Sequence, residues 1–408
     1  MSIKLRRWGI GAVGLIVLLV GFQIMFDAED FLKTKVSSKK VEMLDSVIIG
    51  YDKSNKAWEI KANYIWGGAN KYLFRVEELD YGRLFDPDGD VLLDEIKAYG
   101  VKVNSQTKTI VATNNITARF IKKGDASTAN AITIRSKALK YYGFSKKTYL
   151  NDNVILQTGS TKVMTNEAVL DNETSIVTIN PPFWIHAKGY TASANRMVID
   201  INKDTSKLNG NVSILRKANR RTRDEREDRF SRLSTRLMTD ALIHKRLADE
   251  DVMIFLSGNI DIRQPDKTLK GGAGKYQRSL KRFVLTQNVS LESDDLRWLF
   301  RNKRLAKLKN KKMRAAIGDP VKVTADKMVF LLDKSHLTLE GHIVIKQKTK
   351  TVRCDKLIFD DNKGEILLIG SVYIQMDDDD TIRSEYVRID LPNEEVYFES
   401  QSEIEIEI

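Results

Sequence analysis

Apolar and polar residues alternate in short runs along most of the chain, and clusters of Asn, Asp, Gly and Pro separate these runs. Three of the runs begin at Val154, Phe183 and Val212, which are spaced 29 residues apart. A polar cluster that favours a turn precedes each of them, as at Asp152 and Asn153. Alternation with a period of two predicts half-buried β-strands, and a constant period of this length is typical of stacked repeats. The sequence therefore predicts an array of strand–turn–strand units.

A small residue marks each unit, 18 positions before the apolar residue that begins the run, which we call the anchor. The small residues and their anchors are Ser136 and Val154, Thr165 and Phe183, Ala194 and Val212, Gly271 and Val289, Ala325 and Ile343, and Cys354 and Val372. The period is broken twice, because 48 residues separate Val212 from Ile260 and 54 separate Val289 from Ile343. These breaks predict two insertions.

The two insertions, at residues 216–250 and 293–318, have helical composition and high charge. The first mixes Arg with Asp and Glu, whereas residues 296–314 hold nine basic residues and no acidic one. Because both insertions leave the array at the same point of the repeat, we expect two helices that project from one edge. They are either solvated decoration, or the second contacts an anionic headgroup or a membrane surface. The candidates for that contact are Arg297, Arg301, Lys303, Arg304 and Lys307.

Near the N-terminus, residues 8–26 form a stretch of nineteen residues without a formal charge, and three basic residues precede it. An α-helix of about this length crosses a bilayer, and a basic flank stays on the cytoplasmic side. We predict one transmembrane helix with a cytoplasmic N-terminus, followed by a polar tether over residues 27–41. A cleaved signal peptide is the competing interpretation, but no small-x-small cleavage site follows the apolar stretch.

Composition and motifs indicate the kind of partner and exclude several classes of enzyme site. The formal net charge of +12 favours anionic partners such as phosphates, acidic polysaccharide or a membrane surface. The single cysteine, Cys354, excludes an intrachain disulfide, and its place in the repeat predicts a buried structural thiol. The four histidines lack metal-ligand spacing, and no nucleotide-binding or nucleophile-elbow motif is present. We expect no enzyme activity, no cofactor and no metal.

Two acidic stretches lie near the C-terminus. The four aspartates at 377–380 lack the spacing of a calcium loop and predict a solvated hairpin turn. Residues 403–408 alternate strictly between Glu and Ile, which predicts an edge strand available to a partner.

The alternation also predicts which side chains face the interior of the array. These residues form either an ordinary closed core or the lining of an open apolar groove. The candidates are Val154, Leu156, Phe183, Ile185, Val212, Ile214, Ile260, Ile262, Val289, Leu291, Ile343, Ile345, Val372 and Ile374.

Several of these features occur together in one known family. An N-terminal membrane helix, the motif Trp58-x-Ile60-x-Ala62 and repeats such as residues 208–214, with the form apolar-x-Gly-Asn-Val-x-Ile, resemble LptC, the bitopic inner-membrane component of lipopolysaccharide export. The C-terminal repeats at 325–345 and 354–374 resemble the periplasmic LptA/OstA-like domain of the same system. The two insertions lie outside the pattern of that family.

The resemblance implies an all-β fold, an elongated OstA-like β-jellyroll that is V-shaped in section and shields acyl chains in its interior. It implies a membrane-anchored periplasmic conduit that passes lipopolysaccharide from the inner-membrane ABC transporter towards the outer membrane and pairs edge to edge with a further periplasmic jellyroll. Nucleic acid is not an expected partner. The alternative is an anchored β-repeat scaffold that binds an envelope polymer or a protein. The expected organisation is a cytoplasmic start and transmembrane helix (1–26), a tether (27–41), an LptC-like jellyroll (42–215), a charged helical insertion (216–250), further β repeats (251–292), a basic helical insertion (293–318) and LptA/OstA-like repeats (319–408).

Overall fold

The computed structural model describes residues 41–405 apart from 53, 69, 122–130, 181, 219–232, 248–250, 301–308, 333, 377–379 and 399–402. This part of the chain is almost entirely β-structure. The strands are β1 (Val41–Asp52), β2 (Asn55–Gly67), β3 (Leu73–Val76), β4 (Tyr81–Phe85), β5 (Val91–Lys97), β6 (Val101–Asn104), β7 (Thr109–Phe120), β8 (Ile132–Tyr142), β9 (Lys147–Thr158), β10 (Thr161–Asp171), β11 (Ile176–Ile179), β12 (Phe183–Ala187), β13 (Tyr190–Ser193), β14 (Arg196–Asp200), β15 (Thr205–Arg216), β16 (Thr235–Arg246), β17 (Val252–Gln264), β18 (Lys267–Gln277), β19 (Arg282–Ser293), β20 (Val321–Leu331), β21 (His336–Gln347), β22 (Lys350–Asp360), β23 (Glu365–Gln375), β24 (Thr381–Asp390), β25 (Glu395–Phe398) and β26 (Glu403–Glu405). A 3₁₀ turn, η3 (Arg297–Leu299), and a short helix, α4 (Lys311–Ile317), complete the elements.

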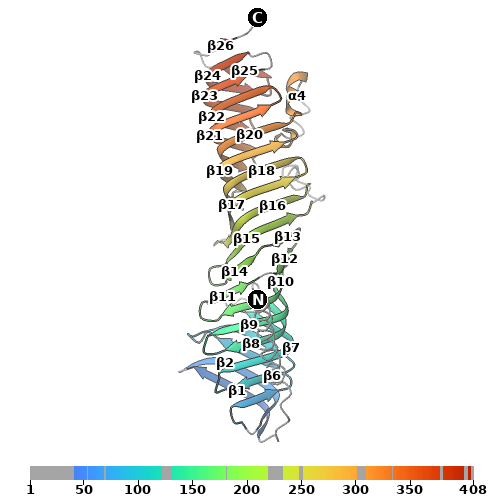
Figure 1. Cartoon of the computed structure of the whole chain (residues 1–408), viewed down its shortest axis with the longest axis vertical. Coiled ribbons are helices and arrows are strands. Elements are labelled where there is room, and N and C mark those ends of the chain that lie inside the picture. The colour runs from blue at the N-terminus through green and yellow to red at the C-terminus, as the bar shows by residue number, and fades with distance from the viewer. Residues whose placement is uncertain are drawn as a thin grey trace, which may run out of the picture.

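Each long strand pairs antiparallel with the layer before it and the layer after it, so that the strands stack into one long column (Figure 1). Five pairs of short strands, β3 with β4, β5 with β6, β11 with β12, β13 with β14 and β25 with β26, each take the place of one long strand. The described strands therefore form 21 layers. At about 4.8 Å between layers the column is roughly 100 Å long. A 29-residue repeat thus contributes two full layers to the column.

Most long strands bend at their middle. In β21 the pairing register with β22 shifts between Glu340 and Ile343. The two residues between them, Gly341 and His342, have φ values of 76° and 44°. This is a β-bulge, in which the extra residues bend the strand. The polar clusters that we expected to form turns between strands are therefore bends within strands, and that part of the prediction is wrong. The physical reason is that Asn, Asp and Gly tolerate positive φ equally well in a bulge and in a turn.

The anchors and the small residues meet at these bends. With Ile116 of β7 counted as an anchor, seven anchors are paired with a small residue of the next strand: Ile116 with Ser136, Val154 with Thr165, Val212 with Thr239, Ile260 with Gly271, Val289 with Ala325, Ile343 with Cys354, and Val372 with Ser384. A large side chain thus alternates with a small one along the fold line. We call the strand half that runs from the bend through the anchor the anchor arm (343–347 in β21) and the other half the far arm (336–340). Inward residues of both arms belong to one hydrophobic cluster, so the arms face each other in a V-shaped section.

The two insertions differ from the predicted helices. Residues 235–246 of the first are the strand β16, which pairs with β15 and β17, so the helical prediction is wrong there. The charged residues before this segment gave it a helical composition and hid a period-two pattern in which Leu237 and Thr239 face inward. Residues 219–232 and 248–250 of this insertion lie outside the described residues. The second insertion contains η3 and α4, and residues 301–308 lie outside the described residues. Both insertions leave from the tip of the anchor arm, after β15 and after β19, as the repeat predicts.

The predicted membrane helix and tether, residues 8–41, lie outside the described residues except for Val41. Among the helices of the described part of the chain, none has the length and apolar character to cross a bilayer. The chain's acidic turn is described only at Asp380, whose carbonyl accepts a hydrogen bond from the backbone N–H of Met376, as expected of a hairpin. The predicted C-terminal strand is confirmed over β26, which pairs with β24.

Candidate apolar groove

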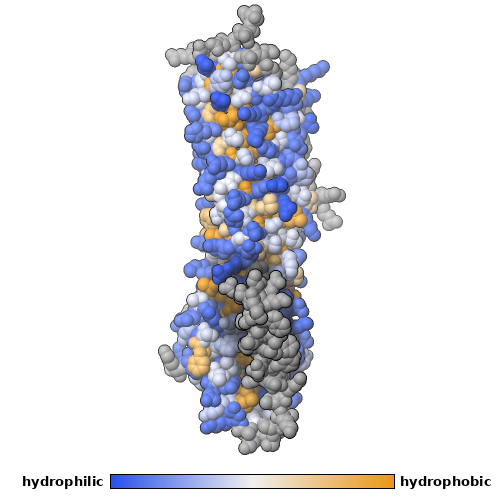
Figure 2. Space-filling model, in the orientation of Figure 1, coloured by the Kyte–Doolittle hydropathy of each residue, from blue (hydrophilic) through white to orange (hydrophobic). Residues whose placement is uncertain are grey.

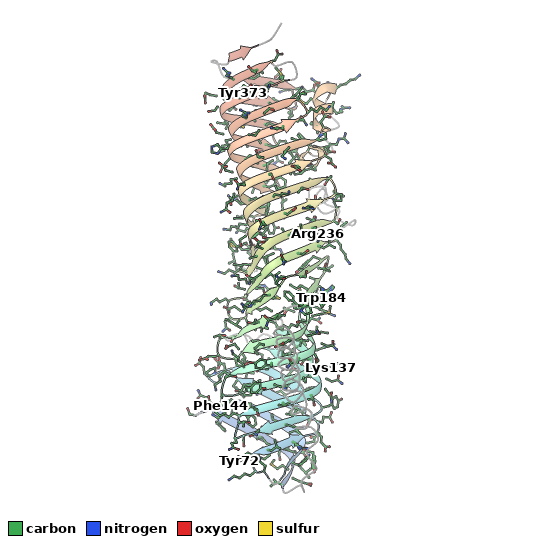
Figure 3. All side chains as sticks on the ribbon, viewed as in Figure 1. Tyr72, Lys137, Phe144, Trp184, Arg236 and Tyr373 are labelled. Atoms are coloured by element: carbon green, nitrogen blue, oxygen red, sulfur yellow. The ribbon has the colours of Figure 1, made fainter. Side chains whose placement is uncertain are left out.

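The structure places the fourteen predicted interior residues on the inner face of the anchor arm. Ten of them are buried, whereas Ile214, Ile262, Ile345 and Ile374 are only partly buried. All seven anchors among them lie at the fold line and are buried, whereas the residue two places later, nearer the tip of the arm, is buried in three layers and partly buried in four. Outward residues alternate with them: Trp184 is 52% exposed between two buried neighbours (Figure 3). The alternation therefore predicted the inner face correctly, and the structure separates it into a closed floor and a more exposed row.

Inward apolar residues are incompletely covered over one continuous part of the column, from β15 to β19, which we call the open stretch. On the anchor arm the partly buried residues are Ile214, Leu237, Ile262 and Leu269, and on the far arm Ile254 and Phe283. In the layers β8 to β10 the equivalent positions, such as Ile134 and Leu156, are buried. On the face shown in Figure 2, hydrophobic patches interrupt the hydrophilic surface in both halves of the column. The interior is thus closed in the layers β8–β10 and incompletely covered over β15–β19, where we call the apolar rows the candidate groove.

Polar side chains border the open stretch at the tip of the anchor arm. Arg216 Nη2 and Gln264 Nε2 both donate to Thr235 Oγ1, at 3.0 and 2.7 Å. The Lys267 ammonium donates to both carboxylate oxygens of Asp266, at 2.8 and 2.7 Å. Burial lowers the pKa of the Arg216 guanidinium from its ordinary value. An apolar lining with a partly charged border is the arrangement that an amphipathic ligand with an anionic headgroup requires.

These border residues were not predicted from the sequence. Arg216, Thr235, Gln264 and Lys267 lie on the four strands β15 to β18, each one inward position nearer the tip than the partly buried apolar residue of its strand, and Asp266 lies in the turn between β17 and β18. The period-two alternation could have identified two of them. Extended by two residues, it leads from Ile214 to Arg216 and from Ile262 to Gln264.

The basic residues predicted to contact a headgroup are described at one position only. Arg297 begins η3, and its side chain is 65% exposed with its Nε 3.9 Å from Asp295 Oδ2. Arg301, Lys303, Arg304 and Lys307 lie outside the described residues, so their role stays a prediction.

Within the described residues, no group of three or more His, Cys, Asp or Glu side chains is placed to hold a metal ion. Cys354 is buried at the fold line, as predicted, and burial raises the pKa of its thiol to about 12. A thiol with this pKa is protonated at neutral pH and packs as a small apolar group.

These features define a class: an elongated, all-β, bent-strand array with an apolar interior that is incompletely covered over part of its length. No family model matches the chain, and no curated protein matches it. Among solved structures, the crystal structure of LptH, the LptA-homologous periplasmic component of the lipopolysaccharide transport device of Pseudomonas aeruginosa, is similar over 43% of this chain and 95% of that chain, with 11% identity and a TM-score of 0.22.

Proposed function

We propose that this chain is a lipid conduit of the lipopolysaccharide-export type, anchored in the inner membrane by residues 8–26. In this proposal it receives lipopolysaccharide from an inner-membrane ABC transporter and carries it through the periplasm along the groove. The observation that carries the proposal is the open stretch, where apolar rows of two facing arms are incompletely covered. A closed structural scaffold would bury these rows as the layers β8–β10 do.

The physical chemistry of the groove suits this role. Each methylene of an acyl chain gains about 0.8 kcal/mol when it leaves water for an apolar environment. A groove therefore holds lipid without a covalent site. The repeat presents nearly the same side chains in successive layers, so a chain that slides by one layer exchanges one set of contacts for a similar set. No catalytic step is required, and energy would come from the partner ATPase.

Site-specific photocrosslinking in living cells tests the conduit. The structure favours Ile262 as the reporter, because it is partly buried in the groove, over an anchor such as Val212, which is 1% exposed at the fold line. Arg263 is the matched control, since it is the next residue along β17 and its side chain points outward and is 54% exposed. We expect a lipopolysaccharide adduct from Ile262 and none from Arg263. Adducts from neither position, in a folded and anchored protein, would favour the scaffold.

The membrane anchor is tested separately. Replacing residues 1–26 by a cleavable signal peptide should move the exported protein from the inner-membrane fraction to the soluble periplasm. Retention in the membrane fraction would show that another part of the chain, or a partner, holds it there.

A further inference from the structure

The described residues of the connection between β19 and β20, 294–300 and 309–320, contact both arms of the V. We call these described residues the strap. The strap leaves the tip of the anchor arm after β19 and returns to the same arm at β20. Between these points the backbone N–H groups of Lys309 and Asn310 both donate to the carboxylate of Glu394, with 2.8 Å for Asn310. Glu394 lies in the turn between β24 and β25, at the tip of the far arm. The strap is therefore fastened to both arms.

The strap also inserts side chains between the arms. Trp298 makes an edge-to-face contact with Phe330, and Phe300 makes one with Phe359, with ring centroids 6.2 and 5.1 Å apart. Both partners are inward residues of the far arm. Phe300 is 3% exposed, and Leu299 and Ile317 are also buried, so the strap is part of the hydrophobic cluster that fills the groove.

Equivalent positions of the repeat show what the strap covers. Val323 lies two residues before its small residue Ala325 and is 6% exposed, whereas Leu269, two residues before Gly271, is partly buried. On the far arm, Leu337 under the strap is buried, whereas Ile254 at the equivalent position of β17 is only partly buried. At these two positions burial is greater beside the strap, whereas Ile345, which pairs with Val323, is partly buried like Ile262. The strap therefore covers the row of Val323 and Leu337 and leaves the row of Ile345 incompletely covered.

The groove opens again beyond the strap. The inward residues Val352, Ile366, Ile374 and Ile389, on β22 to β24, are partly buried. The strap thus separates two incompletely covered parts of one continuous groove.

We infer that the strap is a displaceable plug, which occupies the groove in place of lipid and must lift before lipid can pass from the open stretch to the C-terminal layers. The inference rests on the proposed function and adds its regulation. Trp298, Leu299 and Phe300 fill the apolar space, and Glu394 fastens the plug through two backbone N–H groups at an exposed turn. Because this fastening is polar and lies outside the cluster, it can be released without removing any core side chain.

The experiment compares two cysteine reporters in the full chain with Cys354→Ala, since alanine occupies the equivalent small position at Ala325. Leu269→Cys reports the open stretch and Val323→Cys reports the groove under the strap. The rate of reaction with N-ethylmaleimide is measured for each, alone and with lipopolysaccharide. The releasing variant is Glu394→Ala, and its matched control is Glu395→Ala at the first residue of β25, whose carboxylate accepts a hydrogen bond from Tyr397.

With the strap intact we expect Leu269→Cys to react at least tenfold faster than Val323→Cys. Glu394→Ala should bring Val323→Cys to within about threefold of Leu269→Cys, and Glu395→Ala should not. Lipopolysaccharide should protect Leu269→Cys in all variants and Val323→Cys only when the strap is released.

Three outcomes would overturn the plug. Val323→Cys could react as fast as Leu269→Cys with the strap intact, which would show that the strap does not close the groove. It could stay slow both in Glu394→Ala and in the folded double variant Trp298→Ala/Phe300→Ala, which would make the strap permanent core. Lipopolysaccharide could protect it equally with and without release. By contrast, a failure of lipopolysaccharide to protect Leu269→Cys in any variant would refute the proposed function, independently of the maleimide rates that report strap movement.

Discussion

The fold line of the array depends on glycines in a left-handed conformation, and Gly341 allows this dependence to be measured. Its φ is 76°, and a Cβ at this position would lie 2.2 Å from Asp326 Oδ2 and 2.9 Å from Asp326 Cβ. An L-residue in the left-handed region costs about 1–2 kcal/mol. Asp326 must also rotate away and lose its 2.7 Å hydrogen bond to His342, an exposed contact that adds little to stability. Gly341→Ala should therefore destabilise the layers around β21 by about 1–2 kcal/mol.

Hydrogen exchange is the suitable assay, because a column of stacked layers opens locally as well as globally. A loss of about 1–2 kcal/mol corresponds to exchange that is roughly 5 to 30 times faster, at about 1.4 kcal/mol per factor of ten. We expect this acceleration in amides of β20 to β22 and little change in β7 to β9. Gly89→Ala is the matched control, because Gly89 also has positive φ but a Cβ there meets nothing within 4 Å.

A double-mutant cycle isolates the steric part of the cost. Asp326→Ala removes the oxygen that lies closest to the new Cβ, so the combination with Gly341→Ala should cost less than the sum of the two single changes. Strict additivity would show that Asp326 does not crowd this bend. Equal effects of Gly341→Ala and Gly89→Ala would refute the reasoning that the fold line is sterically special.

Two further predictions concern stability. Hydrogen bonds from Lys108 and Lys146 lower the pKa of Asp52 to about 2. The ionised carboxylate therefore contributes stability that is complete above its unfolded pKa of about 4 and is lost as the pH falls through about 2. Between pH 5 and pH 2 the urea midpoint of the parent should fall more than that of Asp52→Asn, and parallel curves would contradict the prediction. Phe183 is 2% exposed, so Phe183→Ala should lower the free energy of unfolding, measured in urea, by about 3–5 kcal/mol. Trp184 lies on the outer face, and Trp184→Ala should change it by less than about 0.5 kcal/mol. A large effect of the Trp184 change would show that the inward and outward faces are assigned wrongly.

The sequence predicted the inner face well because it depends on local alternation. All fourteen interior candidates face inward, and the pairing of Ile343 with Cys354 explains why a small residue recurs with the anchors. Where the prediction failed, local pattern could not decide. A positive-φ cluster bends a strand or reverses it according to whether the flanking segments find partners in the same layers, and that is a long-range property. The strand β16 was missed because its unit is three residues longer than the others, with 21 residues from Thr239 to Ile260.

The strap was the part that sequence could least predict. Its basic composition indicated a surface helix, and Arg297 is indeed exposed. Its decisive residues, however, are the aromatic pair Trp298 and Phe300, whose partners Phe330 and Phe359 lie tens of residues further along the chain. No periodicity connects an insertion to the repeat that it interrupts, so the contact appears only in the folded chain.

The difference between the repeated layers and the strap that interrupts them affects how lipid would move along the array. In a groove built from near-identical layers, a bound acyl chain that advances by one layer of about 4.8 Å leaves contacts of one kind and gains contacts of the same kind, so the free energy along the groove is nearly level. A level path has no preferred direction and no point of control. The strap breaks this uniformity, because lipid can replace Trp298 and Phe300 in the groove only if their own buried surface is first exposed or moved elsewhere. If the array carries lipid as proposed, the barrier to movement is therefore concentrated at β20 to β22, and the position at which export is controlled lies within the conduit itself as well as at the ATPase that drives it.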